Sequence, residues 1–484
     1  MKKPIWRSKW AGLALILISA ALVIGGYLIL EFYFLFKTSD EIFAFRHRYF
    51  SHLELQLGPY DHHRGDTLKI YLSAAPSKRV DLSIENLLSG EVLWEGSTKG
   101  SYQAVPDSVS IQGTHWQVTH QQPLDYEPGW YLLRAKAEGK ERRSSFFVQP
   151  DSGEVQAKAA ILFSTNTWNA YNYWGGQSIY TAQNYTPTVS FQRPQPLSDP
   201  FIENSYPHHQ WYYQAANKDL PLVQMLDSLG LDCDYYSMAA LEAGDPRLAE
   251  YAVLIMATHS EYWSENMLSH LNQLLDSGVS LVNLAGNVAA YRTFFDLEKQ
   301  TMTIYRRVSE LWQYADTMGL RPFGQQAGFL GFHTYAPYRV MDSSWLWEGA
   351  KVKIGDLVGQ KSNTYDYTYM YSSWWENLLG LRKKGKLGAA AGLEIDVPYE
   401  GTPDNWQVVA KGLNPPVEGF GDVYPDPTLS WDIVAGPDLG YYYHPGGGLV
   451  LGVGSMAFTG ALPHDHALRT LVANAVRRGI ELRE

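Results

Sequence analysis

The sequence predicts an α/β protein in three parts: an N-terminal transmembrane helix, a β-sandwich, and a large domain built on a parallel sheet. Three observations support this. An uncharged stretch of 21 residues runs from Trp10 to Leu30. Short alternating segments fill residues 50 to 150, and apolar strands alternate with helical patterns from residue 157 onward. With 484 residues and 45% hydrophobic content, the chain can fill more than one core.

The N-terminal stretch has the length of a membrane span. About 20 apolar residues cross a bilayer, whereas the apolar part of a signal peptide has about 7 to 15. Basic residues precede the stretch, so residues 1 to 36 are predicted to be a cytoplasmic N-terminus and anchor, with the rest of the chain outside the cytoplasm. We therefore expect a single-pass membrane protein facing the periplasm or the cell surface. A cleaved signal peptide, the alternative, leaves the compartment unchanged.

The net charge and the cysteine content argue against a nucleic-acid partner and against cysteine chemistry. The net charge is -11, and a nucleic-acid partner is not expected because phosphate binding needs a basic face. The chain has one cysteine, Cys233, so no disulfide can form within it. A lone cysteine of this kind usually packs as a small apolar side chain, and we assign it no chemistry.

Residues 50 to 150 are predicted to form a β-sandwich of immunoglobulin or fibronectin type. Six short segments with alternating polarity recur at roughly ten-residue spacing, with turn residues between them. The segment "YDHHRGD" at 60–66 has residue types that bind metals, but a polar turn before the first strand explains it as well, and we favour the turn.

From residue 157 the chain shows the pattern of βαβ units and a parallel sheet. Buried strands are predicted at 159–164, 251–257 and 279–286, and helices at 220–230 and 264–278. We therefore expect one α/β domain over residues 157 to 484.

Polar segments, each predicted to be a loop, follow three of the predicted strands. Open parallel sheets bind ligands beyond the carboxyl ends of their strands, so we expect these segments to meet in one pocket. They are "TNTWNAYNYWGGQSIY" at 165–180, "THSEYW" at 258–263 and "GN" at 286–287. Glu394 lies between Leu393 and Ile395, an apolar setting that is costly for a carboxylate unless it is paired or used.

The predicted pocket offers phenols, carboxylates, one imidazole and one amide. Nucleophilic catalysis is not indicated, because the chain has no G-x-S-x-G turn, and no zinc or phosphate motif is found. A phenolate is a hard donor that only a strongly charged cation keeps deprotonated at neutral pH. Two tyrosinates and a glutamate would suit a trivalent ion such as Fe3+. The alternative is that the aromatic segments are lids or a sugar-binding surface.

Six stretches resemble the large (beta) subunit of N,N-dimethylformamidase, in the C-terminal domain shared by its wider family. They are "TNTWNAYN", "GGQSIY", "THSEYWS", "LVNLAGNVAAYR", "GLEID" and the closing "GVGS" with its final helix. The resemblance covers residues 157 to 480. It implies a class I glutamine-amidotransferase-like (flavodoxin-like) α/β fold that lacks the cysteine nucleophile.

The resemblance also implies a mononuclear Fe3+ site. The metal ligands would be Tyr171, Tyr180 and Glu261, and the residues associated with catalysis would be His259, Asn287 and Glu394. The family's central motif usually has the sequence G-H-D-E-Y-W, and Thr258 and Ser260 replace its glycine and aspartate here. The short segment between the two tyrosine motifs leaves Tyr173 as an alternative to Tyr171.

These observations favour an enzyme: a membrane-anchored, extracytoplasmic, iron-dependent hydrolase of small or N-substituted amides, acting on linear amide C–N bonds. Dimethylformamide itself is not the expected substrate, because the membrane anchor is not part of the characterised enzyme. The rival interpretation is a non-catalytic cell-envelope protein that binds a glycan or a protein partner. The substrate, a homo-oligomer and a small partner subunit are all left open by the sequence.

Overall fold

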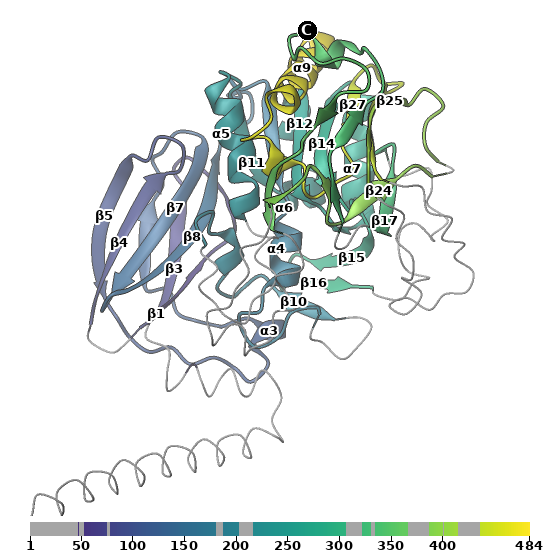
Figure 1. Ribbon diagram of the computed structural model, residues 1–484. Helices are drawn as coiled ribbons and strands as arrows, with labels where there is room; N and C mark the ends of the chain where they lie inside the picture. The colour runs from purple at the N-terminus through teal and green to yellow at the C-terminus, as the bar shows by residue number, and fades with distance from the viewer. Residues whose placement is uncertain are drawn as a thin grey trace, which may run out of the picture.

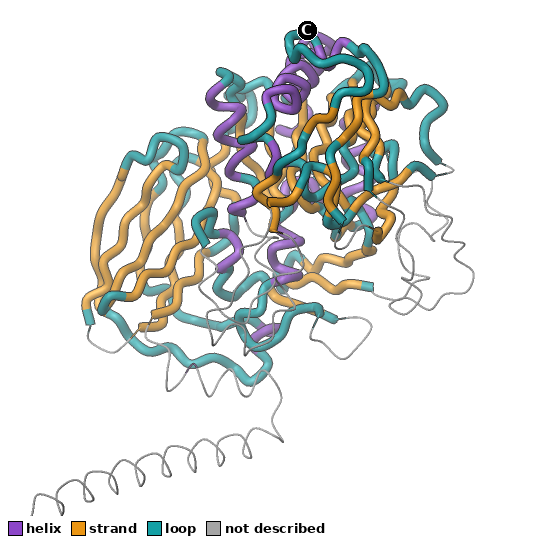
Figure 2. The backbone as a smooth tube through the Cα atoms, in the orientation of Figure 1, coloured by secondary structure: helices purple, strands orange, loops and turns teal. Residues whose placement is uncertain are grey.

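The computed structural model describes most of the chain. The described residues are 47, 53–74, 78–180, 187–202, 216–305, 322–330, 334–365, 387–399, 401–414 and 436–484. Figure 1 shows two parts side by side: a group of strands formed by residues 53 to 149, and a larger part in which helices surround a central sheet. Figure 2 shows that strand segments dominate the smaller part and also run through the centre of the larger one.

Two sheets of the smaller part share one core. The first has the order β1–β3–β6 and the second β2–β8–β7–β4–β5. Their bounds are β1 Leu53–Leu57, β2 Asp61–His63, β3 Thr67–Ala74, β4 Arg79–Asn86, β5 Val92–Lys99, β6 His120–Pro123, β7 Gly129–Ala137 and β8 Lys140–Gln149. Alternation sets the inner face: Val80, Leu82 and Ile84 of β4 are buried with apolar residues of both sheets. The two sheets form a sandwich, and its assignment to the immunoglobulin or fibronectin type stays a prediction.

Nine strands form the main sheet, in the order β11–β9–β12–β14–β27–β26–β25–β19–β20. The first five pair in parallel, and the remaining four are antiparallel to their neighbours. The bounds are β9 Ala159–Phe163, β11 Cys233–Ser237, β12 Val253–His259, β14 Ser280–Gly286, β19 Tyr338–Val340, β20 Leu357–Val358, β25 Gln407–Gly412, β26 Asp438–Tyr443 and β27 Leu449–Gly452. Every residue of β9, β12 and β14 is buried, which is expected for strands covered on both faces.

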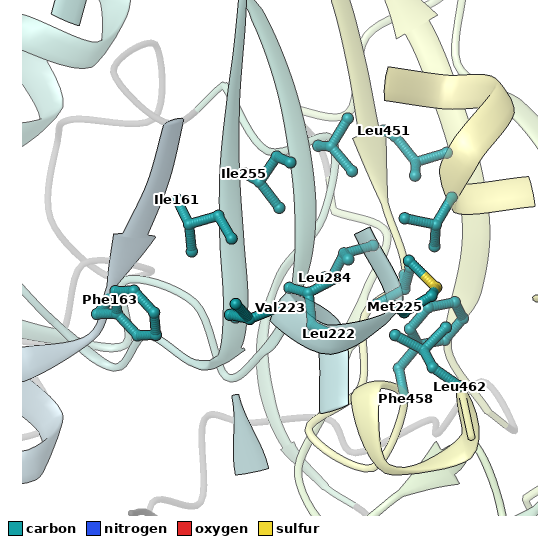
Figure 3. Close-up of a cluster of buried hydrophobic side chains, with 14 of the residues drawn as sticks. Ile161, Phe163, Leu222, Val223, Met225, Ile255, Leu284, Leu451, Phe458 and Leu462 are labelled. Carbon is teal, nitrogen blue, oxygen red and sulfur yellow. The ribbon is translucent and has the colours of Figure 1, made fainter. Parts of the chain in front are cut away.

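Helices cover both faces of the main sheet. Ile161 and Phe163 of β9 pack in the same cluster as residues of α5 and α9, whereas Ala160 and Leu162 pack with α6 and α7. Figure 3 shows Leu222 and Val223 of α5 near Ile161, Ile255 and Leu284 of three adjacent strands. The helices are α3 Val109–Gln112, α4 Thr165–Tyr171, α5 Leu220–Ser228, α6 Met238–Ala243, α7 Glu265–Asp276 and α9 His466–Arg483.

Small sheets lie beside the main one. A four-stranded sheet has the order β10–β16–β15–β13, and three two-stranded sheets pair β17 with β24, β18 with β23 and β21 with β22. The bounds are β10 Thr188–Ser190, β13 Tyr262–Trp263, β15 Tyr291–Asp296, β16 Thr301–Ile304, β17 Gln326–Leu330, β18 Tyr335–Ala336, β21 Ser362–Tyr365, β22 Leu387–Gly388, β23 Ala391–Gly392 and β24 Ile395–Val397. The predicted domain boundaries at 50–150 and 157–484 stay predictions.

The prediction of a flavodoxin-like, class I glutamine-amidotransferase-like parallel sheet is wrong. Strand residues outnumber helical residues in the described chain, and four of the nine strands of the main sheet are antiparallel. The change from parallel to antiparallel pairing occurs where β26 and β27 form a hairpin across residues 444–448. Antiparallel strands can be joined by a short turn, whereas parallel ones need a long crossover, so the glycine-rich "HPGGG" turn reverses the chain here.

The prediction of a single-pass membrane protein is also corrected. Among the described residues, no helix is both long enough and apolar enough to cross a membrane. The predicted span itself, Trp10 to Leu30, lies outside the described residues. The extracytoplasmic localisation rested on that span and has no support in the described part of the chain.

Candidate functional site

The main sheet positions three residues of the candidate site, His259, Glu261 and Asn287. His259 is the last residue of β12 and pairs with Gly286, the last residue of β14. Glu261 follows His259 by two positions and Asn287 follows Gly286 directly. Because β12 and β14 are parallel, their carboxyl ends meet at one edge of the sheet.

Both tyrosines follow β9, the neighbouring strand. The predicted loop at 165–180 begins as helix α4, which ends at Tyr171. Gly175 and Gly176 then have φ values of 103° and 95°, which favour glycine, and the turn brings Tyr180 back beside the helix. The Tyr180 hydroxyl donates to the Tyr171 hydroxyl at 2.7 Å, and the Tyr171 hydroxyl donates to Glu261 Oε2 at 2.9 Å.

Glu394 completes the cluster from the segment between β23 and β24. Asn287 Nδ2 donates to Glu394 Oε2 at 2.6 Å and to Glu261 Oε1 at 3.2 Å. His259 Nε2 lies 3.0 Å from Glu394 Oε2 and 3.4 Å from Glu261 Oε2. The structure thus brings all six predicted residues together, while their roles stay predictions. Of the two alternatives in the helix α4 region, Tyr171 bonds Glu261 and is 3% exposed, whereas Tyr173 is half-buried, so the geometry favours Tyr171.

Two further tyrosines, Tyr262 and Tyr291, lie beside the cluster and were not predicted from the sequence. The Tyr262 hydroxyl lies 2.6 Å from the Tyr180 hydroxyl, and the Tyr262 ring stacks on Tyr291 with centroids 5.6 Å apart. Tyr262 follows Glu261 in the quoted "THSEYW", and its position next to a candidate ligand was the available signal. Tyr291 pairs with Tyr262 across β13 and β15, and no sequence pattern indicates that pairing.

Burial controls the protonation of the cluster. It raises the pKa of Glu261 to about 7, against the opposing effect of His259, and it raises the pKa of Glu394 to about 8. Burial lowers the pKa of His259 to about 4. Near pH 7, His259 is therefore neutral and Glu394 largely carries its proton, so their 3.0 Å contact is not an ion pair between two charged groups. The pKa values of Tyr171, Tyr180 and Tyr262 lie well above the usual value for the same reason.

The donor set fits a hard, highly charged cation. Two phenol oxygens and a carboxylate lie within hydrogen-bonding distance of one another, with Tyr171 and Glu261 buried and Tyr180 half-buried. Asn287 Oδ1 is buried and accepts no hydrogen bond from the described residues. A bound cation would lower the pKa of the phenols and carboxylates, and so offset the cost of burying their anionic forms. A second possible group of metal ligands also includes Glu261. Its members are His259, Glu261 and Glu394, whose potential ligand atoms lie within 4.8 Å of one another.

Comparisons with solved structures are weak. The chain is 11% identical to the sulfur carrier protein SoxY from Chlorobium limicola f thiosulfatophilum, covering 21% of this chain and 79% of that one with a TM-score of 0.13. Extracellular domains 3–5 of Drosophila OTK are 11% identical over 28% of this chain and 43% of that one, with a TM-score of 0.15. A β-glucuronidase of Parabacteroides merdae is 9% identical over 48% of this chain and 23% of that one, with a TM-score of 0.18. These scores carry no argument about fold or function.

The family comparison is more informative. No curated protein matches the chain. Residues 85–469, however, match the family described as "N,N-dimethylformamidase beta subunit-like, C-terminal". The match begins in β4 of the sandwich and ends in α9, so it contains all six residues of the candidate site.

Proposed function

Because the chain belongs to the N,N-dimethylformamidase beta subunit-like family, we propose that it is a metal-dependent hydrolase of small or N-substituted amides. The family match confirms the resemblance inferred from the motifs, and it favours a dimethylformamidase-like hydrolase. The observation that supports the finer proposal is the cluster of two phenols, two carboxylates, an imidazole and an amide, in which only Tyr180 is not fully buried. Such a combination at a strand edge offers both metal ligands and groups that transfer protons.

Tyr171, Tyr180 and Glu261 would hold a ferric ion in this proposal. Their oxygens are hard donors, and two phenolates with one carboxylate balance a charge of three. Fe3+ bound there would supply Lewis acidity, which polarises an amide carbonyl and lowers the pKa of a water molecule. Three protein ligands leave room for water and substrate.

His259 and Glu394 would move the protons. Amide hydrolysis adds water to the carbonyl carbon, breaks the C–N bond and delivers a proton to the departing amine. Neutral His259 can accept the proton from water at Nε2, and the protonated Glu394 carboxyl can give one to the amine nitrogen. Their 3.0 Å contact lets a proton pass from Nε2 to Oε2, which restores both groups.

Asn287 would orient the two carboxylates. Its Nδ2 atom donates to Glu261 and to Glu394, so both N–H groups are used. The expected bond to substrate or to a developing oxyanion would require Nδ2 to leave one of these carboxylates. We therefore propose that Asn287 mainly holds the Glu261 carboxylate and the Glu394 carboxyl in fixed positions relative to one another.

The test compares wild-type protein with Glu261→Gln. We expect the wild type to contain stoichiometric iron, to show a tyrosinate charge-transfer band in its visible spectrum, and to hydrolyse at least one of formamide, N-methylformamide and acetamide. Glu261→Gln should lose the iron, the band and the activity together. Elemental analysis, visible spectroscopy and amine release measure the three properties.

Glu242→Gln is the matched control. Glu242 is also a buried carboxylate, but it bonds Ser264 and Asn266 beside α7, outside the cluster. It should keep iron and activity. Normal iron content and turnover in Glu261→Gln would remove Glu261 from the metal site. Colourless wild-type protein that takes up no added ferric ion and cleaves no amide would contradict the proposal and leave the non-catalytic binding protein.

A further inference from the structure

Arg193 is a fully buried cation that packs against helix α4. It follows the short strand β10, which lies beside α4 (Figure 1), and its side chain is 0% exposed. Each of the five N–H groups of its guanidinium has an acceptor. Nε donates to the Ser190 carbonyl at 3.0 Å, and Nη1 donates to the carbonyls of Trp174 and Gln177 at 2.7 and 3.0 Å. Nη2 donates to the Asn169 carbonyl at 3.1 Å and to Asn169 Oδ1 at 3.4 Å. Burying a charge is costly, and here backbone carbonyl groups offset that cost.

Three of these carbonyl groups belong to the tyrosine segment, residues 169–180, which carries two of the candidate metal ligands. Asn169 lies in α4, two residues before Tyr171, while Trp174 and Gln177 lie between Tyr171 and Tyr180. One planar, rigid group therefore holds the tyrosine segment at three points, one before the first tyrosine and two between the tyrosines. Its bond to the last residue of β10 fixes the same group from outside the segment.

Further hydrogen bonds join the tyrosine segment to the residues after β10 and to itself. Asn172 Nδ2 donates to the Pro194 carbonyl at 2.9 Å, and Asn172 Oδ1 accepts a hydrogen bond from the Trp174 N–H at 2.9 Å. The Ile179 N–H donates to the Ala170 carbonyl at 3.2 Å, which joins the two ends of the segment. The residues after β10 therefore form a frame around the two tyrosines, and the 2.7 Å separation of their hydroxyl oxygens depends on that frame.

The chemistry of the contact requires arginine. A lysine has three N–H donors on one nitrogen atom, whereas a guanidinium presents five donors in a fixed plane. In Arg193→Lys, at least two of the five acceptor atoms therefore lose their donor. Three different nitrogen atoms of Arg193 make the bonds, so a single ammonium nitrogen cannot reproduce their arrangement.

We infer that Arg193 is a positioning residue for the proposed ferric site: it fixes the two tyrosine oxygens at the spacing that one ion needs. Arg193 is not itself a ligand, because a guanidinium has no acceptor atom. A preorganised pair of ligands binds a cation more tightly than a mobile pair, because less conformational entropy is lost on binding. Arg193 thus sets the affinity of the site for iron and the energy of the tyrosinate charge-transfer band. The inference rests on the proposed function, which it deepens by naming a residue that prepares the same site.

Ferric binding to the full chain tests the inference. The probe is ferric nitrilotriacetate, titrated into the iron-free wild type, Arg193→Lys and Arg193→Met while the visible charge-transfer band is recorded. We expect both variants to bind iron about tenfold more weakly than the wild type, and to show a shifted band even when saturated. A purely structural role would lower thermal stability but leave the band of the saturated, folded protein unchanged.

Hydrogen exchange of the iron-free protein gives a second measurement that needs no metal. The amides of Trp174, Gly176 and Ile179 are hydrogen-bonded within the tyrosine segment. They should exchange about tenfold faster in both Arg193 variants, whereas the amides of α7 should exchange at the wild-type rate, which separates local loosening from a global loss of stability. If Arg193→Met does not fold, Arg193→Lys decides, since it keeps the charge and some of the hydrogen bonds.

Arg247→Lys and Arg247→Met are the matched controls. Arg247 is also buried, and its guanidinium donates to the Pro150 carbonyl at 3.0 Å and to Gln149 Oε1 at 2.9 Å, outside the tyrosine segment. Both controls should keep the wild-type band, ferric affinity and exchange rates in the tyrosine segment.

The outcomes separate this inference from the proposed function. A wild type that binds no ferric ion overturns the proposed function, and the assignment of Arg193 to a ferric site falls with it. A wild type that binds iron, with Arg193 variants that keep its affinity, band and exchange rates, overturns this inference alone. Equal changes in the Arg247 variants also overturn it.

Discussion

At the residue scale, Thr258, the residue before His259, is held in an unusual backbone conformation by side-chain contacts. Thr258 has a φ of 55°, a region that β-branched residues rarely adopt. Its hydroxyl donates to Asp219 at 2.6 Å and lies 3.0 Å from the Thr459 hydroxyl. Asp219 precedes α5, yet its side chain makes no capping bond to that helix. The Asp219 carboxyl instead accepts the hydrogen bond from Thr258, the residue with positive φ that precedes His259.

This contact predicts how stability depends on pH. Burial raises the pKa of Asp219 to about 7, against the opposing effect of the hydrogen bond from Thr258, whereas an aspartate in the unfolded chain has a pKa of about 3.9. Between these values the folded chain keeps a proton that the unfolded chain has lost, so the free energy of unfolding falls as pH rises. In Asp219→Asn this fall should be smaller by on the order of a few kcal/mol. Urea unfolding at pH 5 and pH 7.5 measures it, and equal slopes for both proteins would count against the assignment.

The residues of the candidate site differ in how visible they are in the sequence. His259, Glu261 and Asn287 could be predicted because they directly follow strands with continuous apolar patterns. Glu394 could be predicted because a carboxylate between Leu393 and Ile395 is costly without a use. Tyr262 was missed although it directly follows Glu261, whereas Tyr291 was missed because its pairing with Tyr262 across β13 and β15 is not encoded in any local pattern.

At the element scale, one glycine lets β14 approach the segment that carries Glu394. A Cβ atom on Gly286 would lie 2.4 Å from Met456 N and 2.6 Å from Glu394 O, both backbone atoms that have little room to move. Gly286→Ala should therefore separate Asn287 from Glu394 and destabilise the protein by roughly 1–3 kcal/mol. Thermal unfolding measures the stability, and the iron content measures the effect on the proposed ferric site.

Gly58→Ala is the control for that variant. A Cβ atom on Gly58 would meet nothing within 4 Å, and the residue is not among the glycines with positive φ. It should leave both stability and iron content unchanged. If the Gly286→Ala protein keeps wild-type stability and iron content, then β14 and the segment that carries Glu394 tolerate separation at this point.

Elements with strong local patterns were predicted well and those without them were not. The strand predicted at 279–286 is β14, Ser280–Gly286, and the helix predicted at 264–278 is α7, Glu265–Asp276. Helix α4 was predicted as a loop, because asparagine and aromatic residues have modest helix propensity. Burial of all seven of its residues outweighs that preference.

At the scale of the whole molecule, the antiparallel half of the main sheet shows what single-sequence patterns lack. β19, β25 and β26 alternate or run apolar much as parallel strands do, and their direction depends on pairing between distant residues. The fold class was therefore wrong even where individual strands were located, because sheet topology is a property of non-local contacts.

The two parts of the molecule also share apolar contacts. Trp130 of β7 is 1% exposed, and its ring lies 4.7 Å from Phe163 of β9 and 6.4 Å from Tyr235 of β11, measured between centroids. These residues belong to one cluster that joins the sandwich to the main sheet. A shared core means that neither part can unfold without exposing apolar surface of the other, so we expect a single cooperative transition.

Trp130→Ala should uncouple the two parts. Loss of a buried tryptophan costs about 3–5 kcal/mol, and the loss falls on the contact between the parts. Differential scanning calorimetry should show one transition for the wild type and two for Trp130→Ala, with the first at a lower temperature. Trp94→Ala is the control, since Trp94 is half-buried on β5 and stacks on His120 within the sandwich. It should lower the transition temperature without splitting the transition. Two transitions in the wild type would mean that the shared cluster does not couple the parts.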